Sequence, residues 1–204
     1  MDEPKVIKSV SDDQQYIIKS IMNLCNIDKF DIDITYGNGV FWKNLPKPLY
    51  CFDINPQLDY VTCASSDNLP FEENSINSVM FDPPFLTYIK SAREHNSIMA
   101  KRYGGYWKYD ELQDHYTKTI KEAYRVLTKK GIFVVKCQDI VHNHILHSTH
   151  INVVKWSETM FRLKDLFILT AKNRIPIPQK ENEAKKVQKH ARIHHSYFMV
   201  MEKL

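Results

Sequence analysis

The residues best suited to carry out chemistry are Asp82-Pro83-Pro84-Phe85, which stop an apolar run from Ile76 to Phe81. Two consecutive prolines remove two backbone donors, so a strand must end there. The Asp82 carboxylate and the rigid carbonyl groups of the tetrad could each accept a hydrogen from an aromatic amine, and Phe85 could stack on its ring. The alternative is a Pro-Pro turn that only ends a strand.

The tetrad resembles the [DNS]-P-P-[YFW] motif of amino-methyltransferases, which methylate N6 of adenine, N4 of cytosine or comparable amides. The resemblance implies direct methyl transfer from S-adenosylmethionine, without a covalent enzyme intermediate. The leading Asp82 favours N6 of adenine, most of all in DNA, because N4-cytosine enzymes usually begin with Ser. Phe85 departs from the commoner DPPY form. The alternatives are an RNA adenine-N6 or DNA cytosine-N4 methyltransferase, or a catalytically silent nucleic-acid-binding subunit with the same fold.

A glycine turn after the segment 31–36 is the second element of the resemblance. Glycines at such a turn let the backbone approach a nucleotide-like ligand closely. The family pattern D-x-x-[FY]-x-G-x-G holds the methionine end of the cofactor, which implies roles for Asp33, Tyr36, Gly37 and Gly39. Tyr36 lies directly before Gly37, and this departs from the family spacing. A Gly-x-Gly pair by itself is as often a simple turn.

Two further acidic positions complete the expected cofactor site. Asp53 closes the apolar run that starts at Leu49, and an acid at the end of a second strand can accept hydrogen bonds from both ribose hydroxyls. The alternative for Asp53 is an acid that starts a surface turn. Asp67 and Asn68 match the place where the family recognises the adenine of the cofactor, although alone they are ordinary loop residues.

Two basic segments indicate an anionic partner. Residues 86–110 contain five Lys and Arg against two acids, and residues 172–195 contain seven against two, whereas the whole chain has a net charge of +4. Basic residues interleaved with aromatics suit phosphate contact and base stacking. The alternatives are aromatics that fold back onto the core and a solvated charge run. The expected nucleic-acid contacts are Tyr88, Lys90, Arg93, Lys101, Arg102, Tyr106, Trp107, Lys185, Lys186, Lys189 and Arg192.

The elements that must position these residues alternate between strand and helix. This order predicts an α/β fold with an open, mostly parallel sheet and an antiparallel C-terminal hairpin, in which ligands bind beyond the strand carboxyl ends. The resemblance implies the class I, Rossmann-like methyltransferase fold with seven strands, as one domain over residues 1–204 without a separate target-recognition domain. Helices are expected at 12–25, from Asp110 to 127 and at 141–160, with Ser11 and Gln14 as a capping box, and strands at 31–36, 49–53, 60–63, 76–81, 132–136, 166–171 and 196–202.

Composition excludes several other classes. The 204 residues have an ordinary charged fraction of 25%, four cysteines without a CxxC pair, and neither a secretory signal nor an apolar run of membrane-spanning length. We therefore expect a cytoplasmic protein that contacts no membrane. His142, His144, His147 and His150 are expected to be surface histidines of a helix rather than metal ligands. DNA is the favoured partner and RNA an alternative, with a homodimer or a partner subunit for target recognition.

Overall fold

The computed structural model describes residues 6–87, 105–171 and 188–204. In these ranges, one large sheet contains the strands β1 (Val10–Ser11), β2 (Ile32–Asp33), β3 (Tyr50–Asp53), β4 (Thr62–Cys63), β5 (Ile76–Phe81), β6 (Leu127–Cys137), β9 (Phe161–Thr170) and β10 (His195–Lys203). Their order across the sheet is β1-β9-β10-β6-β5-β2-β3-β4. The helices are α1 (Gln14–Cys25), the short 3-10 helix η1 (Val40–Trp42), α3 (Tyr109–Val126) and α4 (Thr149–Ser157).

The sheet is mostly parallel, as the sequence predicts. β10 runs antiparallel to both of its neighbours, β6 and β9, and forms the expected C-terminal hairpin with β9. The large sheet has eight described strands instead of the expected seven, because Val10 and Ser11 pair in parallel with Ile168 and Leu169 at the edge of β9. The order of the other seven strands agrees with the class I methyltransferase fold.

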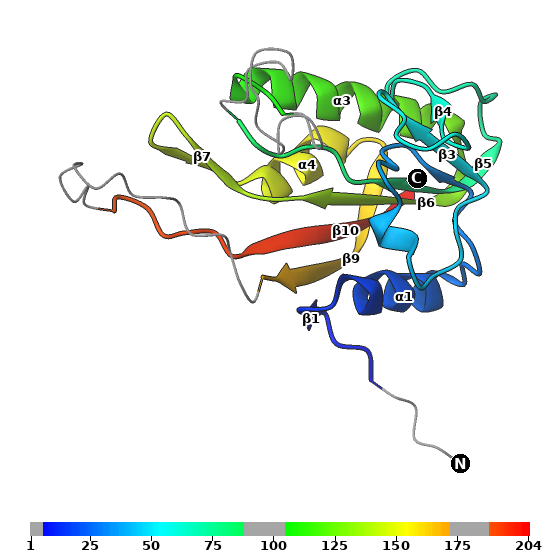
Figure 1. Ribbon diagram of the computed structural model, residues 1–204, viewed down its shortest axis with the longest axis horizontal. Coiled ribbons are helices and arrows are strands. Elements are labelled where there is room, and N and C mark those ends of the chain that lie inside the picture. Colours follow the sequence, from blue (N-terminus) through cyan, green and yellow to red (C-terminus); the bar gives the residue numbers. More distant parts are fainter. Residues whose placement is uncertain (1–5, 88–104, 172–187) are drawn as a thin grey trace.

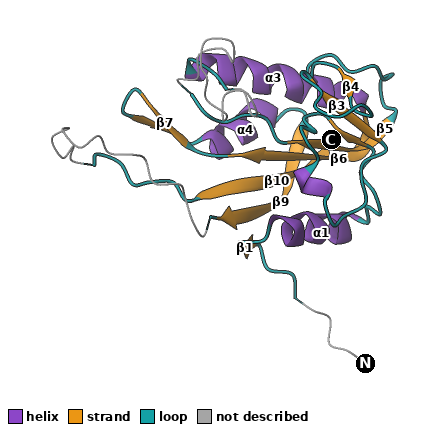
Figure 2. Cartoon of the chain, viewed as in Figure 1, coloured by secondary structure: helices purple, strands orange, loops and turns teal. Residues whose placement is uncertain are grey.

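Helices cover both faces of the sheet, with α3 and α4 on one side and α1 on the other (Figures 1 and 2). Alternate side chains of β5 and β6 therefore enter two separate cores. Phe81 and Val135 pack with the helices α3 and α4, whereas Met80 and Val134 pack with α1 and η1. Because both faces of these strands are covered here, residues 79–81 of β5 and 132–135 of β6 are continuously apolar.

The residues that precede the helices differ slightly from the capping residues expected from the sequence. The Asp13 carboxylate, rather than Ser11, caps α1 by accepting hydrogen bonds from the backbone N–H of Gln15 (2.8 Å) and Tyr16 (3.3 Å). α1 ends where Asn26 adopts a left-handed conformation. α3 begins after Lys108 instead of at Asp110, so Asp110 lies in the first turn, where its charge favours the helix dipole.

The helix expected at 141–160 is confirmed only over α4, and the part of the prediction before Thr149 is wrong. The chain there forms an antiparallel hairpin, β7 (Ile140–His142) with β8 (Ile145–His147), before α4 starts at Thr149. Asn143 and His144 both have positive φ angles, 50° and 61°, as a two-residue hairpin turn of primed type requires. The apolar spacing on which the helix was predicted belongs instead to this hairpin, which projects beyond the end of β6 (Figure 1).

The hairpin also overturns the interpretation of the histidines as surface residues of one helix. His142 and His147 face each other across the hairpin with ring centroids 6.3 Å apart, and His147 stacks on Tyr109 at 3.8 Å. His150 alone lies on α4. In the described residues, no group of three or more His, Cys, Asp or Glu side chains is arranged to hold a metal ion, and no helix is both long and apolar enough to cross a membrane.

Candidate active site

Four polar residues lie at the carboxyl ends of neighbouring parallel strands. Asp33 closes β2, Asp53 closes β3, Asp82 follows β5, and Lys136 lies one residue before the end of β6. The register places Phe81 opposite Val135, so Asp82 and Lys136 occupy the next pair of positions. The fold therefore gathers residues from distant parts of the chain at the edge where open α/β sheets bind ligands.

Asp82 is held by groups on two sides. Its backbone N–H donates to the Thr35 hydroxyl at 2.7 Å, and the Lys136 ammonium lies 3.4 Å from each carboxylate oxygen. Oδ1 is buried, and it accepts no hydrogen bond from any residue that the structure describes. Burial raises the pKa of the Asp82 carboxyl, and the Lys136 ammonium partly opposes this rise.

The last residue of the tetrad, Phe85, borders a cavity of about 350 Å³. Pro83 is buried, whereas Pro84 and Phe85 are half-buried, and Phe85 lines the cavity. Lys136, Gln138 and Gln14 contribute polar groups to the same walls. The volume lies in the range of small-molecule sites, although more of the lining residues are polar than is usual for such sites.

The glycine turn after β2 has one crowded and one open position. Gly37 and Gly39 both adopt positive φ angles, 55° and 72°. A Cβ at Gly39 would lie 2.8 Å from the Tyr36 hydroxyl oxygen, whereas a Cβ at Gly37 would meet no heavy atom within 4 Å. Tyr36 is therefore packed against Gly39, and its hydroxyl lies 3.2 Å from that of Tyr60. Gly37 instead leaves backbone exposed to an open space.

Asp33 stabilises this turn from beneath. Its buried carboxylate accepts hydrogen bonds from the Thr35 backbone (2.9 Å) and the Trp42 indole (2.7 Å). Burial raises its pKa to about 7, although both hydrogen bonds favour the ionised form. Both of its oxygens are thus engaged within the protein, and in this structure Asp33 shapes the turn that a ligand would contact.

Asp53 and the loop around Asp67 lie beside the turn. One Asp53 oxygen accepts the backbone N–H of Gly37 and the other that of Asn55, both at 2.8 Å. Asp67 accepts a hydrogen bond from the Ser65 hydroxyl, and the Asn68 backbone donates to the Ser65 carbonyl at 3.0 Å. These contacts leave the half-buried Asp53 carboxylate and the exposed Asp67 side chain at the rim of the site.

A chain of hydrogen bonds joins the Asp67 loop to the segment after the tetrad. The Ser66 hydroxyl lies 2.8 Å from both the Thr119 hydroxyl and the His115 Nε2 atom. The His115 Nδ1 atom lies 2.5 Å from the Tyr106 hydroxyl, and the Tyr106 backbone donates to the carbonyl of Leu86 at 2.9 Å. Burial lowers the pKa of His115, so its imidazole is neutral near neutral pH.

Most of the expected nucleic-acid contacts lie outside the described residues, namely Tyr88, Lys90, Arg93, Lys101, Arg102, Lys185 and Lys186. Of the others, Tyr106 is half-buried and bonded to His115, so its ring folds toward the core in this structure. Trp107 is 42% exposed, and Lys189 and Arg192 are exposed in the stretch that leads into β10.

The site also contains residues that the sequence did not indicate, above all Lys136 and Gln14. Lys136 ended a run that was recognised only as an apolar strand, and its charge in that run was the available signal. Its partners Asp82 and Gln14 lie 54 and 122 residues away along the chain. The pairing of β5 with β6 brings Asp82 to Lys136, and the start of α1 brings Gln14.

Comparison with known proteins identifies the fold and the family. No curated protein matches the sequence. Among solved structures, the chain is similar to Thermoplasma acidophilum 1320 (12% identity, 92% of this chain, 86% of that chain, TM-score 0.51). It is also similar to a chain in the complex between the Haloferax volcanii Trm112 methyltransferase activator and a candidate methyltransferase (15% identity, 91% and 87%, TM-score 0.51).

Thermus thermophilus TrmN gives a similar match (13% identity, 93% of this chain and 49% of that chain, TM-score 0.50). The chain thus spans about half the length of TrmN and of TTHA0409 from the same organism, of which it covers 47–51%. At these identities the structural matches establish the fold. Residues 76–203 match the N6_N4_Mtase family model, which is described as DNA methylase. This match covers more than half of the chain, including the tetrad and Lys136, and the chain therefore belongs to the N6/N4 DNA methylase family, whose methyl donor is S-adenosylmethionine.

Proposed function

We propose that this protein transfers a methyl group from S-adenosylmethionine to an exocyclic amino group of a nucleic-acid base, with N6 of adenine in DNA as the first candidate. The observation that carries the proposal is the buried Oδ1 atom of Asp82, which accepts no hydrogen bond from the described residues and follows β5 beside the cavity lined by Phe85. The Lys136 ammonium lies 3.4 Å from this oxygen and supplies charge but no hydrogen bond, and a buried acceptor without a hydrogen bond is costly unless a ligand supplies a donor.

The residues around the glycine turn fit the cofactor. The open space beside Gly37 lets a ligand approach the backbone, and Asp53 borders the same space through its hydrogen bond to the Gly37 N–H. Each Asp53 oxygen has a second lone pair, which can accept from a ribose hydroxyl. Tyr36 and Gly39 hold the turn, Asp33 supports it from below, and Asp67 and Asn68 would face the adenine, as the resemblance implies.

The chemical problem is that an aromatic amine is a poor nucleophile, because its lone pair is delocalised into the ring. When bound, S-adenosylmethionine supplies an electrophilic methyl group on a positively charged sulfur. Asp82 Oδ1 would accept one amine hydrogen and a carbonyl of the Pro-Pro segment the other, which drives the nitrogen toward a tetrahedral form and directs its lone pair. Phe85 would stack on the ring. As the new N–C bond forms, the C–S electrons return to sulfur and the nitrogen releases one proton.

The choice of adenine and of DNA rests on the sequence resemblance and on the description of the family model. The leading Asp82 favours adenine N6 by resemblance, and the family model is described as DNA methylase. A base in a duplex must leave the stack to reach Asp82, at a cost of a few kcal/mol. We propose that the basic segments 86–110 and 172–195, a second copy of the chain or a partner subunit supply the contacts that hold the flipped strand.

The test is transfer of labelled methyl from S-adenosylmethionine to unmethylated duplex DNA, single-stranded DNA and total RNA. Digestion and mass spectrometry identify the methylated nucleoside. We expect N6-methyladenine in DNA, lost in Asp82→Ala and strongly reduced in Asp82→Asn, with cofactor affinity unchanged in both. Methylation of RNA alone would overturn the DNA assignment. No transfer to any polymer despite cofactor binding would favour a silent subunit, and equal activity in Asp82→Ala would remove Asp82 from the mechanism.

A further inference from the structure

A lysine is buried at the end of a strand where an apolar side chain would be the less costly choice. Lys136 follows Ile132–Val135, whose side chains are all buried, and its own side chain is 11% exposed. Burying an ammonium group is costly unless partners compensate for the lost water. The presence of a cation at this position therefore needs an explanation beyond packing.

The contacts of the Lys136 ammonium fix it in one place. It donates to Gln14 Oε1 at 3.1 Å, and it lies 4.8 Å from the centre of the Phe41 ring and 5.6 Å from that of Phe198. The two rings and the amide are neutral, so they orient the cation without neutralising it. In the described part of the chain, the carboxylate that pairs with Lys136 is that of Asp82.

The other titratable groups that interact with Asp82 cannot replace this cation. They are the Asp33 carboxyl on β2 and the Tyr116 hydroxyl on α3. The Tyr116 hydroxyl is buried and makes no hydrogen bond within the described residues. An ionised Asp33 repels a second negative charge, and a phenol carries none near neutral pH. Without Lys136, burial and Asp33 would both favour the protonated form of Asp82.

Protonation of Asp82 would disable it in the proposed transfer, because a protonated carboxyl donates a hydrogen bond and loses the negative charge that draws the amine hydrogen toward it. We propose that Lys136 is a positioning residue, whose ammonium holds Asp82 as a carboxylate with Oδ1 left for the amine of the substrate. The proposal rests on the proposed function. If the released proton passes to Asp82, the Lys136 ammonium disfavours the protonated carboxyl, so that the proton leaves to water.

Two readouts test this proposal. In the protein without substrate, the carboxyl carbon signal of Asp82, identified by its absence in Asp82→Asn, is titrated by NMR in wild type and in Lys136→Met. The second readout is the pH profile of kcat, on whichever polymer the wild type methylates. An opposite charge at this distance lowers a carboxyl pKa by about 1–3 units. We therefore expect Lys136→Met to move both the titration and the acid limb of the profile upward by about that much, with recovery at high pH.

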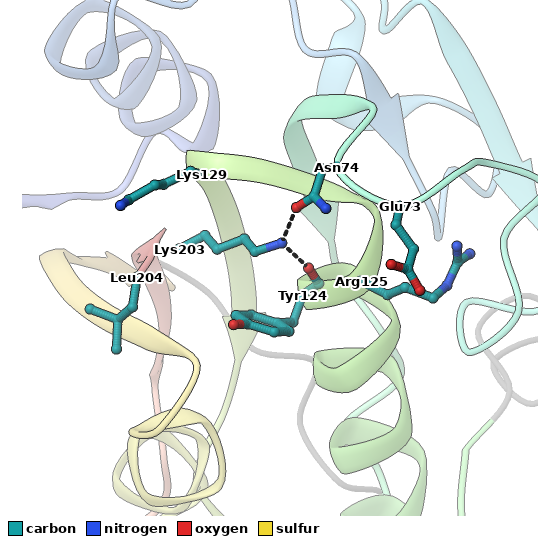
Figure 3. A pocket seen from close by; sticks show the side chains of 7 residues that line it. All are labelled: Glu73, Asn74, Tyr124, Arg125, Lys129, Lys203 and Leu204. Carbon is teal, nitrogen blue, oxygen red and sulfur yellow. Dashed lines mark hydrogen bonds between the residues drawn. The ribbon is translucent and has the colours of Figure 1, made fainter.

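The controls separate charge from packing. Lys136→Arg keeps the cation and should keep the acid limb within about half a unit, given the spread of such effects. Lys203→Met removes another lysine that is buried in the described residues, whose ammonium donates to Asn74 and to the Tyr124 carbonyl at the opposite end of the strands (Figure 3). This change should lower stability without moving the acid limb. If Lys136→Met fails to fold, Lys136→Gln replaces it, since its amide retains a donor for Gln14.

The outcomes are distinct. An Asp82 titration that is the same in Lys136→Met and wild type would overturn the inference, whether or not the protein transfers methyl groups. A loss of kcat by one constant factor at every pH would also overturn it, because that is the result of a structural role alone. Absence of transfer in the wild type, together with a shifted Asp82 titration, would overturn the proposed function and leave the charge coupling established.

Discussion

Gly37 and Gly39 allow the cofactor site to be tested by two alanine variants that share a backbone strain and differ in the space around them. Both residues have left-handed φ angles. At Gly37 an added Cβ meets nothing within 4 Å, whereas at Gly39 it lies 2.8–2.9 Å from three atoms of the Tyr36 side chain. The pair therefore separates the cost of conformation from the cost of contact.

The expected losses of stability follow from these distances. An L residue in the left-handed region costs about 1–2 kcal/mol, so Gly37→Ala should lower the free energy of unfolding by about that amount. For a chain of this length, the melting midpoint should then fall by about 2–8 °C. Gly39→Ala adds displacement of the buried Tyr36 ring, and overpacking of this kind costs about 1–3 kcal/mol more. Its total loss should therefore be about 2–5 kcal/mol.

Cofactor binding should follow the opposite order. If S-adenosylmethionine occupies the open space beside Gly37, a methyl group there should weaken its binding about tenfold or more, equivalent to about 1.4 kcal/mol. Gly39→Ala faces Tyr36 instead, and folded protein of this variant should lose less affinity. The assays are urea unfolding and calorimetric titration with S-adenosylmethionine. Wild-type affinity in Gly37→Ala would refute the placement of the cofactor, and a larger stability loss in Gly37→Ala than in Gly39→Ala would refute the packing argument.

Two further predictions concern stability. Folding raises the pKa of Asp33 from 3.8 to about 7, so its contribution to the free energy of unfolding is fully present below pH 3.8 and is lost as the pH rises through about 7, by on the order of 4 kcal/mol in all. Asp33→Asn should flatten this pH dependence, measured by urea unfolding at several pH values. An unchanged dependence in the variant would assign the pH dependence to other groups. Arg125→Met should lower stability by about 2–4 kcal/mol, because it leaves the Glu122 carboxylate and the carbonyls of Leu69 and Phe71 without their guanidinium donor. Thermal melts measure the loss. The control is Lys118→Met, on the exposed face of the same helix, which should change stability little.

The strand before the tetrad could be predicted residue by residue. Prolines at 83 and 84 end the ladder, and the structure ends β5 at Phe81 as expected. The alternation of strands and helices likewise predicted a sheet whose carboxyl edge gathers Asp33, Asp53 and Asp82. These inferences succeed because the effect of proline on a strand is local, and because the carboxyl ends of parallel strands lie at one edge of a sheet whatever the order of the strands.

Other features depended on information that local patterns lack. The helix expected at 141–160 was right only over α4, because the left-handed pair Asn143-His144 makes the preceding segment a hairpin while its apolar spacing suits either structure. The parallel pairing of Val10 with Ile168 was missed because it joins segments 158 residues apart. Lys136 was missed for the same reason, since its role depends on the register between β5 and β6 and not on its neighbours in the chain.

The hydrogen bonds that join Tyr106, His115, Ser66 and Thr119 have a consequence for how the protein responds to ligands. A neutral imidazole has one N–H and one bare nitrogen, so this row of groups has two proton orders, and in each of them every hydrogen points the same way along the row. A ligand that turns the Ser66 hydroxyl must exchange the tautomer of His115 and reorient the Tyr106 O–H. Because the backbone N–H of Tyr106 donates to the carbonyl of Leu86, the row ends beside the backbone just after Phe85, and a change in the loop beside Asp67 reaches that place through one imidazole tautomer.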